Sequence, residues 1–381
     1  MNSRHSIFLT GVTGTLGKEL IKEMLLSSED KLYVLIRRKG RYSHWDRARK
    51  ILAGFGLESH LGTRVEVLEG DVTLPNMGLK AEQMDFLRKQ TDEFFHIAAI
   101  TALNGSQEEC LKINIGGCDE ALAIGWDFFK HGKLKRFFYF STAYVAGSLQ
   151  TYCAKEDELP EHPAHANFYE SSKYQAEKKV REAMGQGLPV TIFRPSIVVG
   201  DSRTGEVSEF NVIYPFMKLF AHGILSVLPT KLENSVNIVP IDFVIRASLA
   251  IARQKESVGK TFHLVTNEPP PIGMLLKLKD EEYPGLPPIQ IVPPASFKKE
   301  KLDAMSQTVF EMLEPYLGYL NGNLHFDTTN TAQALKDTGI SFPKTDYDFL
   351  KTLLRYAVKV GYLMVPTPVK KNATFTPAVT N

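Results

Sequence analysis

Short apolar runs alternate with amphipathic segments along the first two-thirds of the chain. The runs are partly β-branched or aromatic, as expected of strands buried in a parallel sheet. Between them, apolar residues recur at helical spacing, notably over 107–129 and 169–184. This alternation predicts an α/β fold, a doubly wound parallel sheet with helices on both faces. The predicted strands are 6–9, 31–36, 64–69, 93–97, 136–140 and 190–193.

Beyond about residue 200 the pattern loosens, because proline clusters at 269–271 and 287–288 interrupt regular elements. Helical periods reappear at 299–320 and 347–362. We therefore predict a first domain over residues 1–200 and a smaller, mostly helical, substrate-binding subdomain over 201–364. Apolar segments near 236–265 are expected to return to the first domain. The tail at 365–381 has no apolar periodicity, so we expect it to be poorly ordered.

A glycine-spaced turn at 10–17 joins the first predicted strand to the first helix. Gly11 permits a tight turn, Gly14 lets the backbone approach a pyrophosphate, and Gly17 lets helix and strand pack closely. The helix N-terminus adds free N–H donors for phosphate. A glycine-rich turn without a ligand is the alternative, but the strand-turn-helix context favours a dinucleotide site. Its predicted residues are Gly11, Thr13, Gly14, Thr15, Leu16 and Gly17.

The second predicted strand ends at Arg37 and Arg38. An NAD-binding unit carries an acid near this position for the ribose 2′-hydroxyl, whereas arginines favour the 2′-phosphate of NADP(H). Arg37 is the main candidate, with Arg38 or Arg47 as helpers. A solvated loop is the alternative for Arg38, Lys39 and Arg41. Residues 1–200 are thus predicted to form an NADP-binding Rossmann domain.

Three further predictions concern the ends of later elements. Asp71 and Val72 follow the third strand, where an acid can meet the adenine amino group; capping a turn is an equal alternative for Asp71. Ala98 and Ala99 follow the fourth strand and are small enough for the cofactor to lie against the backbone. Asn114 sits in a helical pattern, where it either faces the surface or holds a bend or a water beside the active site.

Tyr169 and Lys173 are four residues apart, and hence lie on one face of a predicted helix. A lysine beside a tyrosine favours the phenolate and lowers the phenol pKa, which suits proton exchange near neutrality. Alone, this spacing is more often a solvated helix face. Ser141 and Thr142 end the fifth strand at the edge where open α/β sheets bind ligands, and one of these hydroxyls is expected to polarise a substrate carbonyl.

Composition narrows the partners. The formal net charge is only +2, and no long basic block with interleaved aromatic residues argues for nucleic acid. Cys110, Cys118 and Cys153 have no CxxC spacing, which indicates a reducing compartment and argues against a metal site. No signal-peptide core or apolar run of about eighteen residues is present. We therefore expect a cytoplasmic protein without a transmembrane segment, and its oligomeric state is left open.

These motifs resemble the extended short-chain dehydrogenase/reductases over about the first 265 residues. The resemblance implies a triad of Thr142, Tyr169 and Lys173, with Thr142 rather than Ser141 as the hydroxyl. It also implies that Pro195, Ser196 and Ile197 wall the nicotinamide ring. The matching stretches are 10–17, Asp71–Val72, His96–Ala99, Ser141–Thr142, Tyr169–Lys173 and Arg194–Gly200.

A finer resemblance is to the thioester-reductase branch, which includes terminal domains of carboxylic acid reductases and peptide synthetases and the fatty acyl-CoA reductases. The stretches 34–38, 68–79, 140–145 and 194–205 carry it. It implies an NADPH-dependent enzyme that reduces an acyl thioester to an aldehyde and either stops there or continues to the alcohol. No adenylation or carrier domain is recognisable, so a carrier protein or coenzyme A is expected in trans. The apolar segment 210–225 either walls an acyl channel or is a buried packing helix.

Two alternatives stay open. One is an NADP-dependent reductase or dehydrogenase of a ketone, aldehyde, sterol or nucleotide-sugar substrate that uses the same triad. The other is an NADP-sensing protein without catalysis, which the joint presence of Thr142, Tyr169 and Lys173 disfavours.

Overall fold

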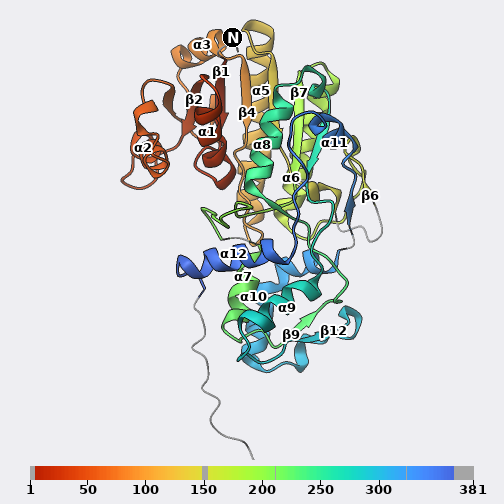
Figure 1. The fold of residues 1–381 in the computed structure, drawn as a ribbon. Helices are drawn as coiled ribbons and strands as arrows, with labels where there is room; N and C mark the ends of the chain where they lie inside the picture. Colours follow the sequence, from red (N-terminus) through yellow and green to blue (C-terminus); the bar gives the residue numbers. More distant parts are fainter. Residues whose placement is uncertain (1–4, 148–152, 211, 323, 364–381) are drawn as a thin grey trace, which may run out of the picture.

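Seven parallel strands form the centre of the molecule (Figure 1). The computed structural model describes residues 5–147, 153–210, 212–322 and 324–363, so the predicted poorly ordered tail lies outside the described residues. The strand order is β11-β7-β5-β4-β1-β2-β3. The strands are β1 (Ser6–Thr10), β2 (Lys31–Ile36), β3 (Val65–Glu69), β4 (Glu93–His96), β5 (Arg136–Phe140), β7 (Val190–Pro195) and β11 (Thr261–Leu264).

The strand order reverses between β1 and β4, which are neighbours in the sheet. Ligands of open α/β sheets bind outside the carboxyl ends of the strands at such a reversal. The predicted α/β, doubly wound parallel sheet is confirmed.

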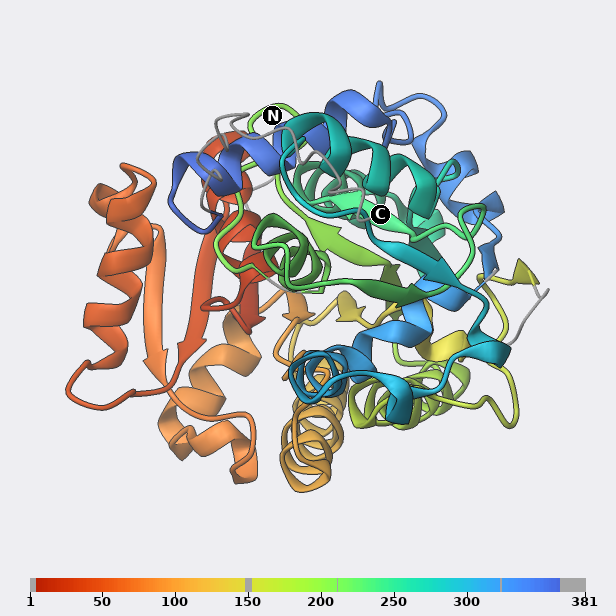
Figure 2. The ribbon, with the colours of Figure 1, turned by 90° about the horizontal axis from the view of Figure 1, so that it is seen from below.

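Helices cover both faces of the sheet (Figure 2). Along β1, Ile7 and Leu9 pack into one apolar core with α1, α2, α8 and α11, and Phe8 packs into another with α3, α5 and α6. Strands buried on both sides explain the continuous apolar runs in the sequence. The helices are α1 (Thr15–Ser27), α2 (His44–Gly54), α3 (Ala81–Gln90), α5 (Gly117–His131), α6 (Phe168–Gly185), α8 (Ile241–Ala252) and α11 (Thr329–Leu335).

The helix predicted over 107–129 is interrupted. It consists of α4 (Gln107–Cys110), a π-helical turn at Leu111–Gly116 and α5. Asn114 lies in the π turn, is buried, and bonds the backbone of Ile100 and the hydroxyl of Ser172. The apolar period alone could not show this break, because it comes from a side chain that bonds two other segments.

The remaining elements gather below the carboxyl ends of the strands in Figure 1 and share a third apolar core. They include α7 (Ile213–Ala221), α9 (Ile272–Glu282), α10 (Ala304–Asn321) and α12 (Tyr347–Lys359). Three short parallel strand pairs accompany them: β8 (Ile197–Val199) with β10 (Ile238–Pro240), β9 (Val227–Pro229) with β12 (Gln290–Val292), and β6 (Cys153–Ala154) with β13 (His325–Phe326).

The helix predicted from residue 299 begins later. A short 3₁₀ turn, Lys299–Lys301, precedes α10, and the Asp303 side chain caps α10 by accepting from the Ser306 N–H. Further 3₁₀ turns lie at Glu58–His60, Pro75–Gly78, Ala143–Ala146, Lys255–Ser257 and Pro294–Ser296.

Chain from beyond residue 200 contributes to the sheet, because β11 pairs with β7 at one edge. The division into 1–200 and 201–364 itself stays a prediction. Among the helices that the structure describes, none is long and apolar enough to span a membrane.

Candidate active site

A cleft of about 770 Å³ opens at the carboxyl ends of the central strands. Its walls come from the glycine turn after β1, the ends of β2, β4, β5 and β7, the start of α6, and two later segments that carry Glu209 and Tyr319. Predicted site residues that line it are Gly11, Thr13, Gly14, Thr15, Leu16, Gly17, Arg37, Arg47, Asp71, Val72, Ala98, Ala99, Thr142, Tyr169, Lys173, Pro195, Ser196 and Ile197. Arg38 and Asn114 are not in this lining.

The glycine turn has the shape that a dinucleotide requires. Gly11 has a φ of +77°, and a Cβ there would lie 2.4 Å from the backbone nitrogen of Ala98. A Cβ on Gly17 would lie 2.3 Å from the Gly11 carbonyl oxygen, so both glycines are needed for close packing. At Gly14 the nearest atom would be 3.4 Å away, which leaves its outer side open. The N-terminus of α1 has no side-chain cap and no acid in its first turn, so its N–H groups are available to an anion.

Three cations line the cleft beside the end of β2: Arg37, Lys39 and Arg47. The Arg47 guanidinium donates to the Arg37 carbonyl oxygen at 2.6 Å. Arg37 lies 3.6 Å from the Asp71 carboxylate. Burial raises the pKa of Asp71, but hydrogen bonds from Thr73 and the charge of Arg37 outweigh it, so the pKa lies below its ordinary value. This basic group next to a charged acid suits the phosphate-bearing end of NADP(H).

Arg38 differs from the expectation. Its side chain is 67% exposed and lies 3.7 Å from Glu69, outside the cleft. Lys39, for which a solvated loop was the alternative, lines the cleft instead. Successive residues after a strand point in opposite directions, and the sequence does not show which of them turns inward.

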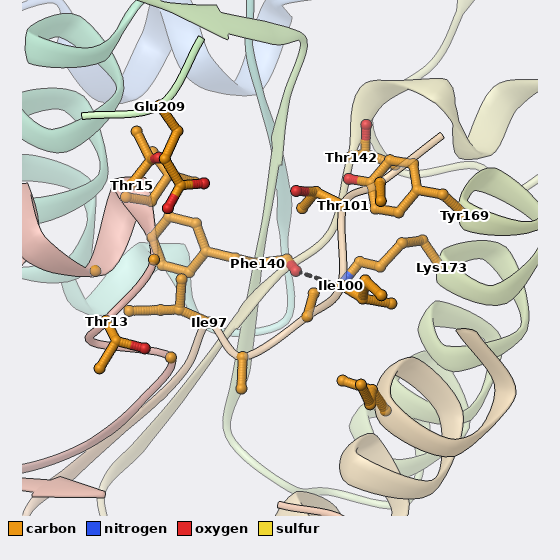
Figure 3. A pocket seen from close by; sticks show the side chains of 18 of the residues that line it. Thr13, Thr15, Ile97, Ile100, Thr101, Phe140, Thr142, Tyr169, Lys173 and Glu209 are labelled. Carbon is orange, nitrogen blue, oxygen red and sulfur yellow. Dashed lines mark hydrogen bonds between the residues drawn. The ribbon is translucent and has the colours of Figure 1, made fainter. Parts of the chain in front are cut away.

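Thr142 and Tyr169 face each other on the wall of the cleft (Figure 3). Thr142 follows β5 and caps the 3₁₀ turn that starts at Ala143. Tyr169 is in the first turn of α6, where Asn167 caps the helix by accepting from the Glu170 N–H at 2.9 Å. The caps orient both hydroxyls from separate elements toward one point of the cleft.

Burial raises the pKa of the Tyr169 phenol to about 12, and a hydrogen bond from Thr142 lowers it only in part. The expected lowering by Lys173 is therefore wrong for this structure. The Lys173 ammonium donates to the Phe140 carbonyl oxygen at 2.7 Å and to the Tyr139 hydroxyl at 2.9 Å (Figure 3). Because these groups on β5 engage the ammonium, its charge does not favour a phenolate. Burial lowers the pKa of Lys173 to about 8.

A buried ionic network lies beneath these residues. Glu177, four residues after Lys173, is fully buried and receives the Ser141 hydroxyl at 2.6 Å. Arg194 at the end of β7 and Arg181 on α6 approach the same carboxylate at 2.6 and 2.8 Å. Burial raises the pKa of Glu177, but the two arginines and Ser141 outweigh it and bring the pKa to about 2. The network ties α6 to β5 and β7 and so fixes the helix that carries Tyr169.

Sequence reasoning missed several residues of the cleft. Tyr144 lies within a stretch that was quoted for the family resemblance, so that stretch carried a signal for it. Thr101, Glu209 and Tyr319 also line the cleft, but they stand outside any recognisable motif. Over the described ranges, we find no group of three His, Cys, Asp or Glu side chains that could hold a metal ion.

Comparison with known proteins places this geometry in a family. The family described as "Male sterility protein" matches residues 9–248. The chain belongs to the male sterility protein family. It is thus an oxidoreductase of the extended short-chain dehydrogenase/reductase superfamily, with an NAD(P)-binding domain, in the thioester-reductase-like branch. The resemblance found in the sequence is confirmed at this level.

Relatives of this male sterility protein domain are often parts of larger proteins. A linear gramicidin synthase from Brevibacillus parabrevis has a polypeptide that is 24% identical over 94% of this chain but only 7% of its own length. Fatty acyl-CoA reductase wat of Drosophila melanogaster is 27% identical over 68% of this chain and 57% of its own length. This chain therefore spans less than two thirds of either protein.

A solved structure covers nearly the whole fold. The terminal R domain from the myxalamid PKS-NRPS biosynthetic pathway superposes with a TM-score of 0.82 at 26% identity, over 96% of this chain and 94% of that one.

Proposed function

We propose that this protein reduces an acyl thioester to an aldehyde with NADPH. The observation that carries the proposal is the pair of hydroxyls, Thr142 and Tyr169, that hydrogen-bond one another on the wall of the dinucleotide cleft. Membership of the thioester-reductase-like branch supports a thioester as the carbonyl compound. The thioester is carried on coenzyme A or on a carrier protein.

Residues of the glycine turn and the basic group bind the cofactor in this proposal. The backbone N–H groups at Gly14 and Thr15 bind the pyrophosphate at the N-terminus of α1. Arg37 and Arg47 bind the 2′-phosphate, and Asp71 meets the adenine. When bound, NADPH supplies the hydride that, with one proton, converts the thioester to a hemithioacetal, which releases a thiol and leaves the aldehyde.

Thr142 and Tyr169 act on the substrate oxygen. Both hydroxyls donate to the oxyanion as it develops, and such preorganised donors are typically the largest catalytic contribution. The high pKa of Tyr169 keeps its proton in place across the neutral range, and the phenol gives that proton to the oxyanion. Lys173 holds the end of β5 against α6 and so positions both donors.

The test is turnover of acyl-coenzyme A thioesters with NADPH. We expect loss of absorbance at about 340 nm with one free thiol and one aldehyde formed per NADPH oxidised. Turnover of ketones or alcohols without any thioester turnover would favour the alternative dehydrogenase. Tight NADPH binding without turnover of any carbonyl compound would favour a sensor.

A further inference from the structure

A second cavity lies beside the cleft, inside the core formed by α7, α9 and α10. Its volume is about 30 Å³, and no charged side chain lines it. Phe216 and Phe220 on α7, Leu228 on β9 and Leu275 on α9 form much of its wall. An apolar cavity of this kind stays dry and attracts hydrocarbon.

Val212 and Tyr319 separate the cavity from the cleft, because both residues line both spaces. The Tyr319 ring packs edge-on against Tyr144, with ring centroids 4.7 Å apart. Tyr144 itself lines the cleft. The cavity and the cleft are therefore one side chain apart.

The Tyr319 hydroxyl is tied to the start of α6. Asn167 donates to it at 3.1 Å, and it donates in turn to the buried Glu170 carboxylate. These two residues flank Tyr169 closely in the sequence, on either side. The dividing side chain is thus anchored beside the proposed proton donor, and a group that passes it starts from the reacting carbonyl.

We propose that this cavity receives the hydrocarbon end of the substrate, so that the substrate class is an unbranched aliphatic acyl thioester. The proposal rests on the function proposed above. A lining without charged groups excludes a charged acyl group. An aromatic ring does not fit, since a cavity that binds benzene is about five times larger, roughly 150 Å³. The segment 210–225, whose two interpretations were open, supplies part of this wall through α7.

Chain length is the property that the cavity controls. Each methylene that enters an apolar site strengthens binding by about fourfold. The gain should stop once the cavity is full, because a longer chain must displace packed side chains. A plot of log affinity against chain length should therefore rise and then break.

The experiment measures binding of S-alkyl-N-acetylcysteamine thioethers, from ethyl to decyl, by calorimetry in the presence of NADP⁺. These probes cannot be reduced, so the readout does not depend on turnover. Phe220→Leu enlarges the cavity and should move the break to longer chains. Leu275→Phe fills it and should move the break to shorter chains, and Leu276→Phe, from a half-buried position on the same wall, serves if the first filling variant does not fold.

Phe349→Leu is the matched control. Phe349 is buried in the same apolar core but does not line the cavity, so the break should stay where it is. The same break in the wild type and in both kinds of cavity variant would overturn the proposal, as would affinity that does not depend on chain length.

Failure of the proposed function looks different. If the thioethers bind with a break that the variants move, but no thioester is reduced, the hydrocarbon site stands and the reductase assignment fails. If thioesters are reduced while the break ignores the variants, the reductase stands and the hydrocarbon site fails.

Discussion

Tyr169 and Lys173 show how burial changes the chemistry that residue spacing suggests. Their separation places both on one face of α6, as expected, and both line the cleft. Burial nevertheless raises the pKa of Tyr169 to about 12 and lowers that of Lys173 to about 8. Tyr169 is therefore a proton donor at neutral pH rather than a ready base, which suits reduction better than oxidation.

Tyr169→Phe should reduce kcat by about two to four orders of magnitude, because it removes the proposed acid and one oxyanion donor. NADPH affinity, measured by fluorescence titration, should stay close to that of the wild type. Tyr174→Phe is the control, since Tyr174 lies on the same helix and bonds the carbonyls of Pro160 and Glu161 outside the cleft. Unchanged turnover in Tyr169→Phe would remove Tyr169 as the donor.

Arg37→Ala should weaken NADPH binding by about ten- to a hundredfold, the usual worth of hydrogen bonds to a charged group. NADH binding should change little, because NADH lacks the 2′-phosphate. Arg38→Ala is the matched control, because Arg38 is exposed and paired with Glu69 outside the cleft. Equal losses for NADPH and NADH in Arg37→Ala would mean that the phosphate is bound elsewhere.

At the scale of elements, α6 is held to the sheet by side chains spaced four residues apart. Tyr169 faces the cleft, Lys173 bonds the end of β5, and Glu177 pairs with Arg194 on β7. One helical face therefore carries the proposed acid and two anchors, and the position of the acid depends on both anchors.

Glu177→Gln should lower the free energy of unfolding at pH 7 by about 3–5 kcal/mol, because it leaves Arg194 buried without its partner. Since the folded-state pKa of Glu177 is lowered from 4.5 to about 2, its contribution is present above pH 4.5 and is lost as pH falls toward 2. The difference between wild type and variant in urea unfolding should therefore shrink between pH 5 and pH 3.

The exposed Glu182 on the same helix supplies the control variant, Glu182→Gln, which should unfold like the wild type. An equal free energy of unfolding for Glu177→Gln and the wild type at pH 7 would show that the buried pair contributes nothing.

At the scale of the whole molecule, the loop after β8 reaches back to the first helix. The Ser208 hydroxyl donates to the Thr15 hydroxyl at 3.2 Å, and Glu209 lies 4.0 Å from Lys18. Glu209 thus brings a carboxylate to the cleft near the N-terminus of α1, where the cofactor phosphates are expected (Figure 3). Like charges in this region oppose each other.

Glu209→Gln should tighten NADPH binding by about two- to fivefold at low salt, the usual worth of one charge near a helix terminus. The gain should shrink at high ionic strength because exposed charges are screened. Titration of NADPH at two salt concentrations measures both effects. Glu206→Gln is the control, from the same loop but outside the cleft, and weaker binding in Glu209→Gln would mean that Glu209 contacts the cofactor favourably.

The sequence by itself determined the parallel sheet, the glycine turn, the basic end of β2, and the shared face of Tyr169 and Lys173. These features depend on spacing within one strand, turn or helix, where geometry follows directly from the order of residues. The family followed from the same motifs.

Only the tertiary structure decided which neighbouring residues face the cleft, as Lys39 does and Arg38 does not. It also paired Glu177 with Arg194 and brought Glu209 and Tyr319 to the site. It reversed the expected pKa shift of Tyr169 as well. Each of these results depends on contacts between segments distant in the chain and on the burial that those contacts create, and local spacing carries no record of either.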